Sequence, residues 1–216
     1  MTRLVIISDT HTREPVLSEG DILIHCGDLT FHGGLKESIR ALDWLNRQHF
    51  KHRIVIAGNH ELGWESDSGR KWLWRDYPHL TFLHNTGVTY EGINFWGSPV
   101  QPYFHGWAFQ KQRSALAEHW SHIPTGTDVV ITHGPPSGFG DTNLRDERFG
   151  DKDLLDRILA VKPIVHCYGH AHYGYGTWNF NDIQFINAAV LDEDYNLRNA
   201  PWVVDISVNP RGCQIS

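Results

Sequence analysis

Five short apolar runs recur along the chain, and each one leads into a cluster of Asp, Asn or His residues, usually beside glycine. The runs cover residues 4–7, 22–24, 54–56, 129–131 and 164–165. Their side chains are mostly β-branched, which is typical of strands that are buried on both faces. Such strands need a layer of structure on either side, so the chain is predicted to fold as packed layers.

Segments with a helical period lie between these runs. Residues 35–50 place four apolar side chains on one stripe, namely Leu35, Ile39, Leu42 and Leu45. Residues 114–122 and 151–161 have the same pattern. The last of these segments begins with Asp151 and Asp153, and acidic residues are favoured in the first turn of a helix. The alternation of strands and helices predicts an α/β-type arrangement.

A second group of segments alternates apolar and polar residues, which is typical of strands with one exposed face. These segments are 81–83, 88–90, 93–97, 177–180, 183–187 and 202–206. Asn181-Asp182 lies between two of them and predicts a hairpin turn. Together the patterns predict an α+β fold, a layered sandwich built on mixed sheets, in a single domain over residues 1–216.

Composition narrows the class of protein. The formal net charge of -6 argues against a broad positive field, and therefore against a stable nucleic-acid partner. No apolar run reaches the roughly 18 residues of a membrane span, so no membrane partner is expected. The cysteines Cys26, Cys167 and Cys213 lack the spacing of a metal motif, and a reduced, cytoplasmic location is expected. The oligomeric state stays open.

The 15 histidines are the unusual feature of the composition, because histidine is the commonest metal ligand in proteins. The apolar runs end in the stretches Asp9-Thr10-His11, Gly27-Asp28, Gly58-Asn59-His60-Glu61, His133-Gly134 and Gly169-His170-Ala171-His172. Each residue alone has an ordinary interpretation as a turn residue, a helix cap or a hydrogen-bonded loop residue. If the five strands share a sheet and a direction, however, their carboxyl ends converge, and the joint pattern predicts a metal site.

These stretches resemble the motifs of the calcineurin-like metallophosphoesterase superfamily over nearly the whole chain. The segment from Gly97-Ser98-Pro99 to Gly106-Trp107 resembles one branch, the small metallophosphoesterase-domain-containing proteins, whose characterised members are similar to cyclic-nucleotide phosphodiesterases. Some members of that branch carry Gly at the first His of the last motif, whereas this chain keeps His170. The resemblance implies a four-layer fold, in which two mixed sheets pack together and are flanked by helices.

The resemblance also implies a dinuclear metal site. One ion would be held by Asp9, His11, Asp28 and His172, and the other by Asp28, Asn59, His133 and His170. Imidazole, carboxylate and amide donors suit two divalent metal ions, manganese first, with iron, zinc or cobalt as alternatives. The implied nucleophile is a hydroxide that bridges the two ions and attacks the phosphoester.

Further residues are predicted to act around these ligands. The resemblance places His60 beside the leaving oxygen, as a general acid or transition-state stabiliser, and the alternative is a hydrogen-bonding partner of a ligand. His25 is predicted to be a satisfied core residue or a hydrogen-bonding partner of a ligand rather than a ligand, and Glu61 to orient His60 or a ligand. The aromatic segment with Tyr103, Phe104 and His105 is predicted to contact the organic part of the substrate, with core packing as the alternative.

Within this resemblance, the residues next to the Gly-Asp motif indicate the substrate class. Protein phosphatases of this fold have an arginine after the Gly-Asp motif, whereas Asp28 is followed by Leu29-Thr30-Phe31-His32. A metal-dependent phosphoric ester hydrolase acting on small phosphodiesters is therefore predicted, with a cyclic nucleotide or a 2′,3′-cyclic phosphate as substrate. The alternatives are a phosphomonoesterase or protein phosphatase, and a non-catalytic metal-binding interaction scaffold of the same fold.

Overall fold

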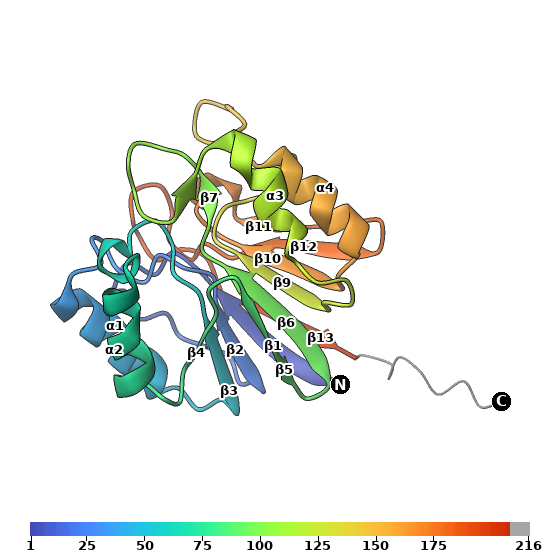
Figure 1. The fold of residues 1–216 in the computed structure, drawn as a ribbon. Coiled ribbons are helices and arrows are strands. Elements are labelled where there is room, and N and C mark those ends of the chain that lie inside the picture. Colours follow the sequence, from blue (N-terminus) through green and yellow to red (C-terminus); the bar gives the residue numbers. More distant parts are fainter. Residues whose placement is uncertain (208–216) are drawn as a thin grey trace.

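A computed structural model of the protein describes residues 1–207, so that Cys213 lies outside the described part of the chain (Figure 1). One sheet has five strands in the order β13-β1-β2-β3-β4. They are β1 (Thr2–Ile7), β2 (Ile22–His25), β3 (His52–Val55), β4 (Thr81–Phe82) and β13 (Trp202–Ile206). β1 to β4 run parallel and β13 pairs with β1 in the antiparallel sense, so this sheet is mixed, as predicted.

The second sheet has six strands in the order β11-β12-β10-β9-β6-β5. They are β5 (Thr86–Tyr90), β6 (Ile93–Ser98), β9 (Val129–Thr132), β10 (Val165–Tyr168), β11 (Gly176–Phe180) and β12 (Ile183–Asn187). The four inner strands are parallel and the two edge strands are antiparallel. The predicted turn at Asn181-Asp182 joins β11 to β12, and both residues have the positive φ of a tight hairpin turn. A short pair, β7 (Gln101–Pro102) and β8 (Gln110–Lys111), stands apart.

Helices cover the outer face of each sheet (Figure 1). They are α1 (Leu35–Asn46), α2 (Asp67–Asp76), α3 (Leu116–Ser121) and α4 (Lys152–Val161), with the 3-10 turns η1 (Leu62–Trp64), η2 (Arg113–Ala115) and η3 (His172–Gly174). One apolar cluster joins the two sheets, a second packs α1 and α2 on the five-stranded sheet, and a third packs α3 and α4 on the six-stranded sheet. The predicted four-layer sandwich is therefore confirmed.

The five apolar runs are divided between the sheets rather than sharing one. Three belong to β1, β2 and β3, and two belong to β9 and β10. Their carboxyl ends nevertheless meet, because Ser8 after β1 forms a parallel bridge to Ala189 after β12. Ser8 N donates to Ala188 O at 2.9 Å, and Val190 N donates to Ser8 O at 3.0 Å. The two sheets are thus joined at the edge where the polar clusters lie.

The helix predicted over residues 35–50 is too long. α1 ends at Asn46, because the chain turns there to enter β3. Arg53 in β3 donates from Nη1 to the main-chain carbonyls of Asn46 and Gln48, at 3.4 and 2.6 Å. These carbonyls are therefore satisfied without a further helical turn.

The predicted apolar stripe of this helix is also partly wrong. Leu35 and Ile39 are 62% and 40% exposed, whereas the other two residues of the stripe are buried. The buried position in the first turns is Ser38, whose Oγ accepts a hydrogen bond from Trp64 Nε1 at 2.9 Å. A polar residue faces inward here because it has a buried indole as its partner.

The remaining helices were predicted only where an apolar pattern with a helical period marks them. The predicted segment 114–122 corresponds to η2 and α3, and 151–161 corresponds to α4 with Asp151 as its N-cap. α2 has no predicted counterpart, because charged residues interrupt its apolar pattern and only Leu73 is buried. Among the described residues, the helices are too short or too polar to cross a membrane.

Replacement of Asp151 is predicted to lower the free energy of unfolding. Its buried side chain caps α4 by accepting from the N–H groups of Asp153 and Leu154, and its Oδ2 accepts from Trp120 Nε1 at 2.6 Å. Asp151→Ala removes the cap and leaves a buried indole donor unpaired, so the free energy of unfolding should fall by about 2–4 kcal/mol in urea denaturation.

The matched control is Asp156→Ala on the same helix. Asp156 forms only an exposed ion pair with Lys152, so this change should alter the free energy of unfolding by less than about 0.5 kcal/mol. Equal losses in the two variants would contradict the assignment of Asp151 as cap and buried acceptor.

Candidate metal centre

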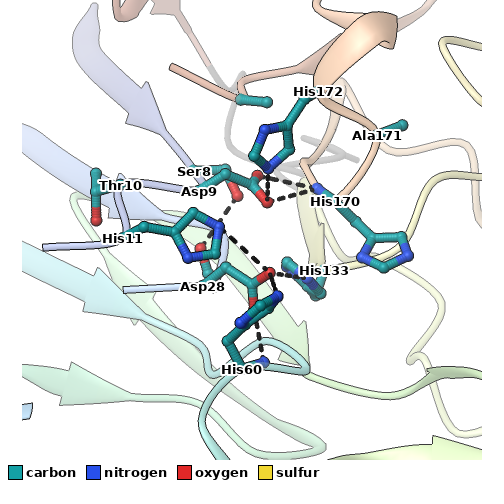
Figure 2. Close-up of polar contacts among 12 residues, drawn as sticks. Ser8, Asp9, Thr10, His11, Asp28, His60, His133, His170, Ala171 and His172 are labelled. Carbon is teal, nitrogen blue, oxygen red and sulfur yellow. Dashed lines mark hydrogen bonds and ion pairs between the residues drawn. The ribbon is translucent and has the colours of Figure 1, made fainter. Parts of the chain in front are cut away.

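The structure brings all seven predicted ligands together at the end of the sandwich where the two sheets join, and Figure 2 labels all of them except Asn59. Asp9 and His11 follow β1, Asp28 follows β2, Asn59 follows β3, His133 follows β9, and His170 and His172 follow β10. The carboxylates of Asp9 and Asp28 face the surrounding imidazole rings (Figure 2). Both carboxylates are buried, at 0% and 2% exposure.

The ligand atoms form two adjoining clusters, and a third group, of His11, Asp28 and His60, shares one residue with each of them. Those of Asp9, His11 and His172 lie within 4.8 Å of one another, and so do those of Asp28, His133 and His170. Asn59 extends the second cluster, since its Oδ1 lies 3.0 Å from His133 Nε2. Asp28 stands between the clusters, because its Oδ2 lies 3.2 Å from His133 Nε2 and 3.9 Å from His11 Nε2.

Main-chain carbonyls fix the orientation of three of these histidines. Nδ1 of His11 donates to Thr30 O at 2.7 Å, Nδ1 of His133 to Cys26 O at 2.9 Å, and Nδ1 of His172 to Asp192 O at 2.9 Å. With Nδ1 protonated, the neutral ring presents the Nε2 lone pair to the site. Nε2 of His11 is buried and has no hydrogen-bond partner among the described residues.

The buried carboxylates of the two clusters favour positive charge beside them. Nε2 of His133 faces two acceptor oxygens, from Asn59 and Asp28, at 3.0 and 3.2 Å. Burial lowers the pKa of His133, but the Asp28 carboxylate, Asp9 and the hydrogen bond to the Cys26 carbonyl together raise it to about 9. Burial likewise lowers the pKa of His172, and the Asp9 carboxylate raises it to about 9. Burial raises the pKa of Asp28, yet the neighbouring His133 holds it well below its usual range.

This donor set fits divalent metal ions. A cation between the Nε2 atoms and the carboxylate oxygens would take the place of the protons that the raised pKa values of His133 and His172 hold there. The donors are imidazole nitrogens, carboxylate oxygens and one amide oxygen, and no thiolate takes part among the described residues. Such a set suits manganese, iron, zinc or cobalt rather than a cysteine-based structural zinc.

The backbone is strained at the candidate ligands. Asp9, His11, Asp28 and His170 all have positive φ, between 41° and 66°, although none of them is glycine. Such conformations are costly and persist where the surrounding structure enforces them, as at functional sites. The adjacent Gly169 is required for a different reason, because a Cβ there would lie 2.0 Å from Asp9 Oδ2.

Glu61 ties together the loops that carry two of the ligands. Oε1 accepts from N and Oγ1 of Thr30 at 2.9 and 2.8 Å, and Oε2 accepts from Asp28 N at 3.0 Å and Gly58 N at 2.7 Å. Burial, followed by the charge of Asp28, raises the pKa of Glu61 to about 8, while the donors of Gly58 and Thr30 oppose the rise. Glu61 thus supports the site without entering either cluster, as predicted.

His60 lies beside both clusters and opens towards a cavity. Its Nδ1 donates to Phe31 O at 2.6 Å, and its Nε2 lies 3.9 Å from Asp28 Oδ2. The ring centroid of Trp107 lies 4.3 Å from that of His60. Because Nδ1 is held by a carbonyl, Nε2 is the atom that faces the site and can exchange a proton there.

His25 is a supporting residue, as the sequence predicts. Its Nδ1 accepts from Gly27 N at 3.2 Å, and its Nε2 donates to Thr10 Oγ1 at 2.9 Å. Burial lowers the pKa of His25 to about 3, so the ring is neutral near pH 7. Both ring nitrogens are used within the protein, and neither is available to a metal.

A cavity of about 590 Å³ lies over the clusters. Of the predicted substrate contacts, Tyr103 and Phe104 line it, whereas His105 does not and instead packs against Phe104 with 4.5 Å between ring centroids. The sequence analysis gave no role to two other residues of its wall, Arg113 and Tyr195. Arg113 belongs to η2 and Tyr195 to the loop between β12 and β13, and their places over the site depend on tertiary structure, which no local pattern marks.

Comparisons with known proteins agree with this geometry. The family model described as calcineurin-like phosphoesterase matches residues 2–174. Human metallophosphoesterase domain-containing protein 1 is 36% identical over 231 aligned positions, which cover 95% of this chain and 71% of that protein. UPF0046 protein K07C11.7 of Caenorhabditis elegans is 35% identical, with coverage of 93% of this chain and 74% of that protein.

A solved structure shares the fold. TT1561 of Thermus thermophilus superposes with a TM-score of 0.64 at 12% identity, over 87% of this chain and 89% of that chain. The layered sandwich and its buried carboxylate and imidazole clusters are those of a metal-dependent phosphoesterase. The chain belongs to the calcineurin-like phosphoesterase family.

The variant Glu61→Gln tests whether the hydrogen bonds of Glu61 position the metal ligands. Each carboxylate oxygen of Glu61 accepts from at least one main-chain N–H, so an amide NH₂ must oppose a donor in either orientation. Metal affinity should therefore fall about 10- to 100-fold in a calorimetric titration with Mn²⁺. Glu118→Gln, an exposed change on α3, should bind Mn²⁺ like the wild type. Unchanged affinity in Glu61→Gln would show that these four hydrogen bonds do not position the ligands.

Proposed function

We propose that this protein is a two-metal phosphodiesterase for small phosphodiesters, with a cyclic nucleotide or a 2′,3′-cyclic phosphate as its substrate class. The observation that carries the proposal is a pair of adjoining ligand clusters, with Asp28 between them, beneath a cavity with aromatic walls. A cavity of about 590 Å³ is of the size that holds small organic ligands.

The ligand roles follow from the two clusters. The first ion would be held by Asp9, His11, Asp28 and His172, and the second by Asp28, Asn59, His133 and His170. Manganese is the first candidate, and iron, zinc and cobalt suit the same donors. When bound, the two ions would supply Lewis acidity and a water-derived nucleophile for attack on phosphorus. The carboxylates of Asp9 and Asp28 would fix where the two ions bind. The histidines whose Nδ1 donates to a main-chain carbonyl direct Nε2 towards the site.

His60 is proposed to protonate the leaving oxygen. Its Nδ1–H is held by Phe31 O, so a second proton on the ring is carried by Nε2, which faces the site. Trp107 packs against the ring and restricts its rotation. A group fixed in this way can deliver its proton without first being reoriented.

The walls of the cavity support a diester rather than a monoester substrate. A phosphomonoester dianion calls for a further cation near the metals, but the residues after Asp28 are Leu29 and Thr30, both buried. The two arginines of the cavity wall are both engaged by the protein, since Arg148 pairs with the buried Asp141 at 2.8 Å and Arg113 donates to the main-chain oxygen of Phe149 at 3.1 Å. Tyr103 and Phe104 instead offer aromatic surface, which suits the organic groups on either side of a diester.

We also propose a cytoplasmic location and no stable nucleic-acid partner. Support comes from the free thiols of Cys26 and Cys167, which are both buried, and from the net charge of -6.

Metal-dependent cleavage of a diester is the direct test of the proposed function. Chelator-treated protein should hydrolyse neither bis-p-nitrophenyl phosphate nor p-nitrophenyl phosphate, because the carboxylates and imidazoles alone provide no activated nucleophile. Added Mn²⁺ should restore cleavage of the diester at a higher kcat/KM than that of the monoester. Preference for the monoester would favour a phosphomonoesterase, and metal binding without turnover of either ester would favour an interaction scaffold.

His60→Ala should separate metal binding from proton transfer. The variant should bind Mn²⁺ like the wild type, while kcat for bis-p-nitrophenyl phosphate falls about 100-fold or more. The loss should be larger for a dialkyl ester, whose poorer leaving group depends more on protonation. His79→Ala, on the exposed surface, serves as the matched control. An equal loss with good and poor leaving groups would exclude the general-acid role.

A further inference from the structure

The loop over residues 192–196, between β12 and β13, covers the first ligand cluster. Tyr195 on this loop lies with its ring centroid 5.0 Å from that of His11 and 5.3 Å from that of His172. Phe31 packs against Tyr195 as well, with 5.6 Å between centroids. Three rings thus surround one tyrosine side chain, and two of them are candidate metal ligands.

The loop is anchored to the same histidine that it covers. The carbonyl oxygen of Asp192 accepts both from His172 Nδ1 and from Tyr195 N, each at 2.9 Å. Oδ1 of Asp192 accepts from the N–H groups of Asp194 and Asn196, at 3.0 and 2.8 Å. One residue therefore sets the orientation of His172 and the position of Tyr195 together.

The backbone of Tyr195 carries a conformational cost. Its φ is +59°, in the left-handed region, where a bulky side chain is rarely found. Strained residues of this kind persist where the surrounding structure enforces them, and they cluster at ligand-binding sites. Asp9, His11 and Asp28 show the same feature, so Tyr195 shares a property of the candidate ligands.

The hydroxyl group of Tyr195 is left without a protein partner among the described residues. Tyrosine hydroxyls elsewhere in the structure bond to protein atoms, as in Tyr77, Tyr90, Tyr168 and Tyr175. Within residues 1–207, Tyr195 is the least exposed tyrosine whose hydroxyl makes no such bond, at 36% exposure against 57% for Tyr103 and 58% for Tyr173. Tyr195 also lines the cavity above the clusters. A constrained phenol with an unused donor in a ligand cavity is suited to bind the ligand itself.

We propose that the Tyr195 hydroxyl donates a hydrogen bond to an oxygen of the phosphoryl group bound over the cluster of Asp9, His11 and His172. This inference rests on the proposed function in so far as the ligand is a phosphoester. Tyr195 is then a further catalytic residue, which contacts the reacting group from the side of the cavity where the candidate metal ligands lie. Its ring is held by His11, His172 and Phe31, so the donor is in place before the substrate arrives.

Tyr195→Phe removes only the hydroxyl and is the primary test. The variant should bind Mn²⁺ with the wild-type stoichiometry and affinity in calorimetry, because the ring contacts remain. Inorganic phosphate should bind the Mn²⁺-loaded variant about 10-fold more weakly than it binds the loaded wild type. The kcat/KM for bis-p-nitrophenyl phosphate should fall about 10- to 100-fold. Tyr173→Phe, a neighbouring exposed tyrosine outside the cavity wall, should match the wild type in all three measurements.

The outcomes separate this inference from the proposed function. Wild-type phosphate affinity in Tyr195→Phe would overturn the inference, and so would loss of Mn²⁺ binding, which would mean that the hydroxyl serves the metal ligands. If the wild type cleaves no phosphoester, but phosphate affinity still depends on the hydroxyl, the proposed reaction fails and the phosphoryl contact stands. Tyr195→Ala, which also removes the ring, should weaken Mn²⁺ binding, whereas Tyr195→Phe should not.

Discussion

The rest of the site depends on the buried carboxylate of Asp28. It is 2% exposed, and its Oδ2 lies 3.2 Å from Nε2 of His133 and 3.9 Å from Nε2 of both His11 and His60. A carboxylate so far from water is stable only when nearby groups compensate its charge. Because carbonyls fix the Nδ1 protons of these three histidines, the Nε2 atoms point towards the carboxylate, and the arrangement suits divalent cations.

The two sheets provide the rigidity that this arrangement needs. Asp9 and Asp28 adopt left-handed backbone conformations directly after β1 and β2, whose buried strands hold the loops in place. Glu61 then joins the loop after β2 to the loop after β3 through four hydrogen bonds. The strain at the ligands is thus compensated by packing and hydrogen bonding below them, which is how irregular loops acquire a fixed geometry.

Much of the fold and the central part of the site could be predicted from the sequence, because both leave local signals. Buried strands appear as apolar runs, and a ligand such as Asp28 lies close after the end of its strand in the sequence. α2 leaves no such signal, since only Leu73 is buried on it. Tyr195 was missed for a related reason, because it reaches His11 only through the fold. His105 failed as a wall residue because the 102–109 loop turns it towards Phe104 instead.

The most direct test of the central claim is electron paramagnetic resonance of the Mn²⁺-loaded protein with parallel measurement of bound metal. Two ions that share Asp28 as a ligand would lie about 3.5–4 Å apart and would be magnetically coupled. The account predicts two Mn²⁺ per chain with a coupled spectrum, and loss of the coupling in Asp28→Asn. A single ion per chain, or two ions with the spectrum of isolated Mn²⁺, would contradict a shared site at Asp28.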